Sequence, residues 1–357
     1  MIDIVIVGAG IAGITLARRY AEEYNKKVLI VERKSHIGGF CYDYRNAEGI
    51  LVHKYGPHIF RTDSNKVYSF LSRFTKWYDY QHKVLAYVGG KYYPMPINLD
   101  TVNSFLNTNY SSDTVMEYFS QVKTQPSAVD NVKDVVESQV GEVFYKAFFE
   151  EYTRKQWGEE PSKLPVDIIS RIPIRTNRDD RYFTSKYQGV PKEGYTSLFN
   201  SMLDHPNIKI LLNTDFKEVK NEIVWDKLFY SGSIDEYFDY VYGRLPYRCV
   251  SFDVEEVEQE YYQPVAVVNY PNNYDYTRIT DYKYFTKNES KTTVIAKEYP
   301  SAIGEPSYPI PLRQNLELYQ KYRKIDTQNI TFIGRLGKYK YYSMEQIVEE
   351  ILEMSLI

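Results

Sequence analysis

The chain has 357 residues, 43% of them hydrophobic and 25% charged, and its formal net charge is −3. This composition is ordinary for a globular protein, and the length suggests two to three domains. There is no basic tail and no apolar run of membrane-spanning length, so we expect neither nucleic-acid binding nor membrane insertion. Two cysteines cannot form a disulfide framework and the first residues lack a signal-peptide pattern, which together predict a cytoplasmic protein.

The first forty residues follow the order strand, glycine-rich turn, helix and strand. Residues 4–7 and 28–31 are short apolar runs, and 11–24 has the periodicity of a helix. The second strand ends at Glu32. This order is the fingerprint of a Rossmann-type dinucleotide-binding unit.

Each glycine of the turn has a physical role in that fingerprint. Gly8 permits the tight turn, Gly10 lets a pyrophosphate approach the backbone, and Gly13 lets the helix pack closely on the strand. The helix N-terminus offers N–H groups to the diphosphate, and Glu32 can accept hydrogen bonds from a ribose diol. The alternative is a glycine-rich turn without a ligand, which the complete pattern disfavours.

The residues after Glu32 bear on the choice between NAD and FAD. Arg33 follows directly, and the pair Gly38 and Gly39 comes a few residues later. An acid, a base and a glycine pair in this order resemble the extended fingerprint of the glutathione-reductase-like flavoproteins. We therefore expect FAD, with a second contact to the flavin from the C-terminal part of the chain.

The middle of the chain alternates between strand and helix patterns. Residues 67–77 predict a helix, and 82–96 predict a hairpin that turns at a glycine pair and starts a second sheet. A helical bundle is expected next, from four segments: 99–106, 114–122, 132–139 and 141–157. Phe148 and Tyr152 share a helix face, which is usually a core stripe, but their polar neighbours favour a partly wet cleft.

Residues 165–181 predict a basic loop. It carries four arginines among aspartates and prolines: Arg171, Arg175, Arg178 and Arg181. Two interpretations are open, a solvated charged loop and an arginine clamp for a phosphorylated substrate.

The rest of the chain returns to the first sheet and completes the second one. Residues 189–194 predict a turn into a helix at 195–203, followed by a strand at 208–212. The second sheet is completed by strands at 248–254, 265–270, 276–285 and 292–298.

The C-terminal stretch predicts a strand that ends at Gly334, a loop, and a last helix that begins at Ser343. Ser343 and Gln346 have the spacing of a capping box. We expect the N-terminus of this helix to face the flavin and to stabilise negative charge on its reduced form.

These elements define an α/β protein: a Rossmann-like FAD-binding domain with an inserted helical bundle and an antiparallel β-sheet domain. We expect the FAD-binding domain to span 1–76, 189–246 and 312–357. The helical bundle is expected at 98–170, and the sheet domain at 77–97, 171–188 and 247–311.

Motifs along nearly the whole chain resemble the UDP-galactopyranose mutases. In chain order they are GAGIAG, HIGG, YGPHIF, YTRKQWG, RIPIR with DDRYF, QGVPKEGYTSLF, YSGSIDEYFDYVYGRLPYR, YTRIT, EPSYPIP and FIGRLGKYKY. Several motifs in the same order make the resemblance specific.

The resemblance implies an isomerase of polysaccharide biosynthesis that interconverts the pyranose and furanose forms of a UDP-sugar, UDP-galactose or UDP-N-acetylgalactosamine. It implies a reaction on reduced FAD, whose N5 forms a covalent adduct with the anomeric carbon while UDP leaves and returns. NAD(P)H or another reductant for the flavin and a homodimer are also implied.

Site residues follow from the matched motifs. Catalytic roles are implied for Arg171, Arg278, Arg335, His58, Tyr308 and Tyr341. Substrate binding is implied for Phe148 and Tyr152 at the uracil, and for Trp157, Tyr182, Phe183 and Arg61. The cofactor residues are Gly8, Gly10, Gly13, Glu32, Arg33, Gly38, Gly39, Gly334, Arg335, Ser343 and Met344.

Three positions depart from the family's usual residues. Arg61 replaces a histidine after the GPHIF run, Phe40 replaces an asparagine after the glycine pair, and Ser343 replaces an aspartate. Arg61 bears on the identity of the sugar, because an arginine can donate to an acyl or hydroxyl oxygen that a histidine would not reach.

Two other functions remain open from the sequence. An FAD-dependent amine oxidase-like oxidoreductase would need an apolar cleft, which the arginines and tyrosines disfavour. A flavin-free carrier protein of the same fold would not need the glycines and Glu32 of the fingerprint. No metal-ligand cluster and no Ser-His-Asp set is expected.

Overall fold

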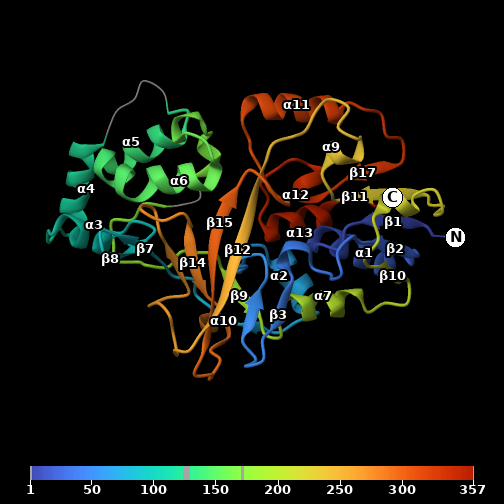
Figure 1. The fold of residues 1–357 in the computed structure, drawn as a ribbon, viewed down its shortest axis with the longest axis horizontal. Coiled ribbons are helices and arrows are strands. Elements are labelled where there is room, and N and C mark those ends of the chain that lie inside the picture. The colour runs from blue at the N-terminus through green and yellow to red at the C-terminus, as the bar shows by residue number, and fades with distance from the viewer. Residues whose placement is uncertain (1, 124–128, 170–172, 357) are drawn as a thin grey trace.

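The computed structural model describes residues 2–123, 129–169 and 173–356. A parallel sheet with its helices lies at one end of the molecule, a helical insert lies at the other, and a long sheet stands between them (Figure 1). Among the described residues, no helix is both long enough and apolar enough to cross a membrane.

The parallel sheet has five strands in the order β10-β2-β1-β11-β17. They are Ile208–Leu211, Val28–Val31, Ile4–Val7, Lys227–Tyr230 and Ile330–Phe332. Helix α1 (Ile11–Tyr24) buries its apolar face against this sheet and packs between α7 (Tyr195–Leu203) and α13 (Met344–Glu353). The predictions for β1, α1 and β2 are confirmed to the residue, because hydrophobic runs and a glycine turn are local signals.

The second sheet has seven strands in the order β16-β12-β15-β14-β13-β7-β8. They are Pro306–Pro309, Tyr247–Val257, Thr293–Ser301, Arg278–Asp281, Val267–Asn269, Val84–Val88 and Lys91–Met95. All neighbours are antiparallel except β13 and β7, which run parallel. The predicted antiparallel sheet is therefore confirmed with one exception, at the junction between two distant segments of the chain.

One predicted strand of this sheet is partly wrong. Residues 276–285 hold β14, but the strand stops at Asp281 and a helical turn, α10 (Lys283–Thr286), follows. The Asp281 carboxylate accepts hydrogen bonds from the backbone of Tyr262 at 2.8 Å and Lys283 at 3.3 Å, which turns the chain out of the sheet.

The helical insert packs against the second sheet around a shared core. Its segments are α3 (Leu99–Leu106), α4 (Ser112–Val122), α5 (Val132–Phe144), a π-helical turn (Tyr145–Phe149) and α6 (Glu150–Trp157). The predicted break before residue 141 is a kink at Gly141, where φ is +81°. A Cβ at Gly141 would lie 2.8 Å from the Val122 carbonyl oxygen, so only glycine fits this helix crossing.

Two predictions near the first sheet are partly wrong, in their bounds. The helix predicted at 67–77 is α2 (Asn65–Ser72), and residues 77–78 form β6. Residues 189–194, predicted as a turn, belong in part to β9 (Tyr187–Pro191), which pairs with β6 and with β5 (Phe60–Thr62) in a three-stranded sheet. Such long-range pairing overrides local helix and turn propensity.

The remaining short elements connect these layers. The helical ones are Gly39–Cys41, Pro161–Lys163, Val166–Ile168, α8 (Phe216–Val219), α9 (Ile234–Tyr237), α11 (Arg313–Arg323) and α12 (Gly334–Gly337). β3 (Asp43–Arg45) and β4 (Leu51–His53) form a two-stranded sheet.

Candidate active site

Two cavities lie next to each other where the parallel sheet meets the seven-stranded sheet. The first has a volume of about 270 Å³ and the second about 330 Å³. His58, Arg335 and Met344 line both cavities. The two cavities are therefore joined at a common wall, built from two distant parts of the chain: the loop that holds His58, and the C-terminal segment that holds Arg335 and Met344.

The glycine-rich turn and the start of α1 form one wall of the first cavity. Gly10 is the N-cap of α1 and provides no side-chain cap, so the first N–H groups of the helix face a space that suits an anion. Gly8 has φ of +101°, and a Cβ there would lie 2.1 Å from the Ser231 hydroxyl oxygen. Gly13 does not line the cavity; its Cβ would lie 2.1 Å from the Gly8 carbonyl oxygen, so it supports the turn from behind.

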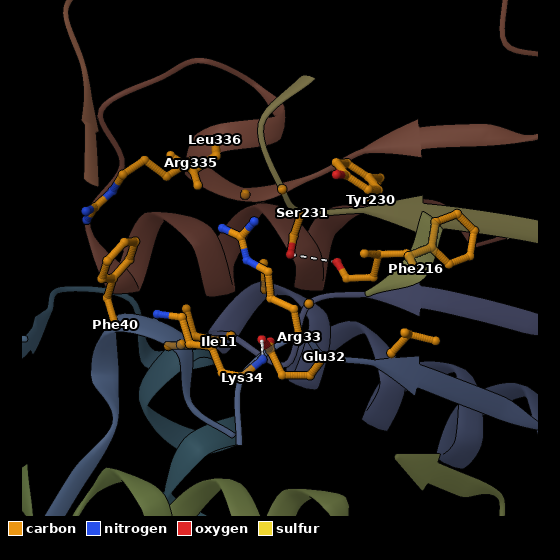
Figure 2. Close-up of a pocket in the computed structure, with 18 of the residues that line it drawn as sticks. Ile11, Glu32, Arg33, Lys34, Phe40, Phe216, Tyr230, Ser231, Arg335 and Leu336 are labelled. Atoms are coloured by element: carbon orange, nitrogen blue, oxygen red, sulfur yellow. Dashed lines mark hydrogen bonds between the residues drawn. The ribbon is translucent and has the colours of Figure 1, made fainter. Parts of the chain in front are cut away.

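Glu32 directly follows β2 and lies at the floor of this cavity (Figure 2). Its carboxylate accepts hydrogen bonds from the backbone N–H of Ala9 at 2.7 Å and of Lys34 at 2.8 Å. The remaining lone pairs of the two oxygens can accept from a ligand hydroxyl. Arg33 also lines the cavity and pairs with Glu236 at 3.4 Å.

The predicted glycine pair lies at the same cavity as the glycine-rich turn. Gly38 and Gly39 line the first cavity, and both have positive φ, +90° and +55°. A Cβ at Gly39 would lie 3.0 Å from the Gly10 Cα, so side chains here would fill the groove. A backbone-lined groove at a helix N-terminus with an acid at its end fits a dinucleotide.

Phe40, the departure noted from the sequence, belongs to a cation–aromatic cluster at the same cavity. Its ring lies 5.2 Å from the Lys34 ammonium, which is also 4.3 Å from the Tyr55 ring. Lys34 forms an ion pair with Glu305 at 2.6 Å. Phe40, Lys34 and Glu305 all line the first cavity.

Arg278, the first residue of β14, is the central cation of the second cavity. Its guanidinium donates to the Tyr152 hydroxyl, and its Nε lies 3.5 Å from a carboxylate oxygen of buried Glu298. Burial lowers the pKa of Arg278, but Glu298 and the nearby tyrosines raise it by more, so the residue keeps its charge. The cavity therefore presents a charged guanidinium, paired with Glu298, to an anionic ligand.

Arg335 stands between the two cavities. It donates to the carbonyl oxygens of Ser307 at 3.2 Å and Tyr342 at 2.8 Å, and its guanidinium lies 4.7 Å from the Tyr308 ring. Tyr308 and Tyr341 line the second cavity with their ring centroids 5.5 Å apart. These contacts hold the Arg335 guanidinium and the hydroxyl groups of Tyr308 and Tyr341 at the same cavity as Arg278.

The predicted substrate residues gather around the same space. All six line the second cavity: Phe148, Tyr152, Trp157, Tyr182, Phe183 and Arg61. Arg61 stacks on the Phe183 ring at 4.3 Å and lies 3.7 Å from the Glu345 carboxylate. The structure thus brings together residues that lie on the π-helical turn, α6, β5 and the segment before β9.

His58 faces both cavities as a neutral imidazole. Burial and the neighbouring His53 lower the pKa of His58 to about 3. Its Nδ1 lies 2.8 Å from the Gly56 carbonyl oxygen, which can only accept, so Nδ1 carries the hydrogen and Nε2 is an acceptor.

Ser343 lies next to the wall that the two cavities share. Gly334 and Met344 line the first cavity, but Ser343 lines only the second. The Gln346 side-chain oxygen accepts from the Ser343 backbone N–H at 3.1 Å and from its hydroxyl at 3.0 Å, so the predicted capping box is confirmed. That this cap faces the cofactor stays a prediction: Ser343 lines the second cavity, and the next residue, Met344, lines both.

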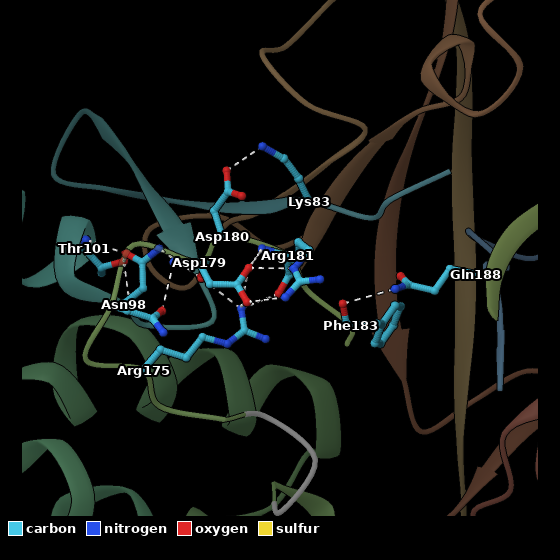
Figure 3. A network of polar contacts seen from close by, with 10 residues as sticks. Lys83, Asn98, Thr101, Arg175, Asp179, Asp180, Arg181, Phe183 and Gln188 are labelled. Atoms are coloured by element: carbon cyan, nitrogen blue, oxygen red, sulfur yellow. Dashed lines mark hydrogen bonds and ion pairs between the residues drawn. The ribbon is translucent and has the colours of Figure 1, made fainter. Parts of the chain in front are cut away.

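The basic loop contributes no described arginine to the second cavity; Arg171 lies outside the described residues. Figure 3 shows Arg175 and Arg181 turned toward Asp179. Arg181 binds both oxygens of that carboxylate, at 2.9 and 2.8 Å, and Arg178 pairs with Asp100. For these three arginines the contacts favour the solvated-loop interpretation, and a clamp through Arg171 stays a prediction.

Sequence reasoning missed Glu298, Arg248 and Glu345, which line the second cavity. Glu298 had a signal: it ends a predicted strand of the sheet that contains Arg278, and the two are cross-strand partners. Among the described residues, no group of three His, Cys, Asp or Glu side chains could hold a metal ion.

Fold and cavities together define a Rossmann-type dinucleotide-binding enzyme whose cofactor cavity opens onto a cationic ligand cavity. A sequence model of the UDP-galactopyranose mutase family matches residues 147–341, and one of the NAD(P)-binding Rossmann-like domain matches residues 6–74. The chain belongs to the UDP-galactopyranose mutase family. It is accordingly an isomerase that acts on a nucleotide-linked sugar and uses a flavin cofactor.

Relatives and solved structures agree with this assignment. The chain is 41% identical to a probable UDP-galactopyranose mutase of Klebsiella pneumoniae, over 98% of this chain and 93% of that protein. It is 37% identical to the dTDP-fucopyranose mutase of Escherichia coli, over 99% and 97% of the two chains. A crystal structure of reduced UDP-galactopyranose mutase has the same fold, with a TM-score of 0.79, 16% identity and coverage of 99% and 94%.

Proposed function

We propose that this protein interconverts the pyranose and furanose forms of UDP-galactose or UDP-N-acetylgalactosamine on reduced FAD. The observation that carries the proposal is the shared wall of the two cavities. A groove suited to a dinucleotide opens at His58, Arg335 and Met344 onto a cavity with fixed cations and tyrosine hydroxyls. A diphosphate-linked sugar in the second cavity would present its anomeric carbon at that opening.

The first cavity would hold FAD through backbone and carboxylate contacts. Gly8, Gly10, Gly38 and Gly39 leave room for the pyrophosphate, and Glu32 suits the ribose diol. When bound and reduced, FAD supplies the nucleophile for the anomeric carbon, so that UDP can leave and return.

The chain's own residues would stabilise the departing diphosphate. Arg278 carries its charge into the cavity, and by family resemblance Arg171 adds a second cation. Tyr308 and Tyr341 would donate hydroxyl hydrogen bonds to the same phosphates, and Arg335 would act beside flavin and sugar. Fixed charges of this kind favour the state in which UDP has left.

Aromatic residues would bind the rest of the substrate. Phe148 and Tyr152 suit the uracil, Tyr182 and Phe183 support the nucleotide, and Trp157 lies beside Tyr341, where the sugar is expected. NAD(P)H or another reductant for the flavin, and a homodimer, complete the proposal by family resemblance.

A second substrate class deserves the same test. The E. coli relative named dTDP-fucopyranose mutase covers this chain as fully as the galactose enzymes. Arg61, Phe183 and Glu345 form a charged corner of the second cavity that can distinguish sugars.

Product analysis tests the proposal. Dithionite-reduced and oxidised protein are incubated with UDP-galactofuranose, its N-acetylated analogue and dTDP-fucofuranose, and the pyranose products are separated by chromatography. We expect turnover of at least one UDP-sugar by the reduced protein only. Equal activity in both redox states would contradict the mechanism, and hydrogen peroxide release from an amine would favour an oxidase. A colourless protein that binds no FAD would favour a carrier.

A further inference from the structure

Helix α6 carries Tyr152 and Trp157 into the second cavity, whereas Arg278 and Glu298 approach from the seven-stranded sheet. The cavity therefore depends on how α6 is docked on the sheet. The helix has only eight residues and follows a π-helical turn. Propensity alone does not stabilise so short a helix, so its position depends on tertiary contacts.

Lys155 makes the contact from the helix to the sheet. Its ammonium donates to three backbone carbonyl oxygens, those of Tyr270 at 2.6 Å, Tyr274 at 2.9 Å and Tyr276 at 3.0 Å. These residues lie on the connection between β13 and β14, and β14 begins at Arg278. All three donors of the lysine are used, so it holds this connection as a unit.

Arg248 makes the opposite contact, from the sheet to the helix. This residue of β12 is 7% exposed and donates to the carbonyl oxygens of Lys155 at 2.9 Å and Gln156 at 3.0 Å. Carbonyls in the last turn of a helix lack intrahelical partners, and a cation there also favours the helix dipole.

Gly158 makes room for this contact. It ends α6 with φ of +67°, and a Cβ there would lie 2.6 Å from an Nη atom of Arg248. Three residues of the YTRKQWG motif thereby have a structural role. Lys155 and Gly158 dock the helix on the sheet, and Trp157 lines the second cavity.

We propose that Lys155 and Arg248 form a reciprocal clamp that sets the position of α6 on the sheet, and thereby the geometry of nucleotide binding. They are positioning residues: Lys155 acts on the connection that leads into Arg278, and Arg248 acts on the last turn of α6, which carries Trp157. The Tyr152 hydroxyl and the Arg278 guanidinium meet between them. A helix displaced by even 1 Å separates such partners, which is costly for binding and turnover. The role of the clamp in catalysis rests on the proposed function.

The test compares Lys155→Met with Lys146→Met in the FAD-loaded protein. Lys146 is on the same insert, but it is exposed and pairs with Glu142 one turn away. UDP, and dTDP in parallel, are titrated well below the melting temperature. We expect Lys155→Met to weaken binding of the preferred nucleotide about tenfold, with a larger rise in KM than fall in kcat, and Lys146→Met to match wild type. A merely structural role would lower the melting temperature without changing the affinity of the folded protein.

Hydrogen–deuterium exchange of peptides covering 150–157 and 270–276 gives an independent readout. We expect faster exchange in both segments of Lys155→Met, because the variant loses the three hydrogen bonds that join them. Unchanged exchange together with wild-type affinity would overturn the clamp. If wild type binds neither nucleotide, the proposed function fails, but the exchange comparison still decides the clamp.

A milder variant covers the case in which Lys155→Met does not fold. Asn272 lies on the same connection and donates from its side chain to the Ala147 carbonyl oxygen at 2.9 Å. Asn272→Ala should loosen the same docking, with about threefold weaker nucleotide binding and faster exchange at 270–276. Wild-type values in Asn272→Ala would then overturn the proposal.

Discussion

Arg278 carries the clearest prediction for a single residue. Its charge is fixed in the second cavity by Glu298 and by the hydroxyl of Tyr152. Loss of a hydrogen bond to a charged group costs about 1.5–3 kcal/mol. We expect Arg278→Ala to lower kcat/KM by roughly 10- to 150-fold while FAD absorbance is retained. Arg278→Lys should recover only part of the loss, because lysine lacks the planar fork. Wild-type turnover in the alanine variant would show that Arg278 does not bind the diphosphate.

Arg61 carries a prediction about the choice of sugar. It lines the second cavity, stacked on Phe183 and close to Glu345, where the family commonly has histidine. An arginine held in this way can donate to an acyl oxygen. We expect Arg61→His to change the ratio of kcat/KM for the N-acetylated and plain galactose substrates. The same ratio in both proteins would mean that Arg61 does not contact the sugar.

At the scale of an element, the cap of α13 can be tested apart from catalysis. Ser343 is the N-cap, and Gln346 completes the capping box. Replacing an N-cap serine by alanine costs about 1 kcal/mol. We expect Ser343→Ala to lower the free energy of unfolding by this amount, measured by denaturant titration. Ser343→Asp is the matched control because aspartate caps equally well, and its stability should equal that of wild type.

The kink at Gly141 is a second prediction at this scale. With φ of +81° and a Cβ that would lie 2.8 Å from the Val122 carbonyl oxygen, alanine would be strained and would also push α4 away. A residue forced into such a backbone region costs about 1–3 kcal/mol. We expect Gly141→Ala to lower the melting temperature. Val143→Ala, at an exposed position of the same helix, is the control and should change it little.

At the scale of the whole molecule, buried histidines make the free energy of unfolding depend on pH in the acid range. Burial lowers the pKa of His53 and, together with Arg278, of His82 to about 3. In the unfolded chain each histidine binds a proton below about pH 6.5, and in the folded chain neither does until near pH 3. The unfolded state therefore binds more protons in this window, so stability falls as the pH falls through it.

Each of the two histidines contributes a slope of about 1.4 kcal/mol per pH unit between these limits. Denaturant titrations at pH 7, 6 and 5 on wild type and His82→Phe isolate one of them. We expect the variant to lose stability with falling pH less steeply, by about that slope. Parallel curves would show that His82 is protonated in the folded protein.

The cofactor half of the fold could be predicted from the sequence because its signals are local. The apolar runs of β1 and β2 and the glycines between them specify strand, turn and helix within about thirty residues, without help from the rest of the chain. The hairpin β7–β8 and the capping box at Ser343 are local in the same sense. Family motifs also pointed to the residues of the second cavity, although the roles of these residues stay predictions.

Tertiary structure decided what depends on distant segments meeting. The pairing of Trp77 with Pro191 turned a predicted helix end and a predicted turn into two strands. The neutralised arginines near Asp179, and the side of the cavity wall on which Ser343 lies, follow from side-chain contacts that no periodicity encodes. Local sequence patterns predicted a dinucleotide groove and supplied a set of polar motifs. These became one site because α6, β14, α12 and the loop with His58 converge on the second cavity, and the energies that place these elements come from tertiary contacts.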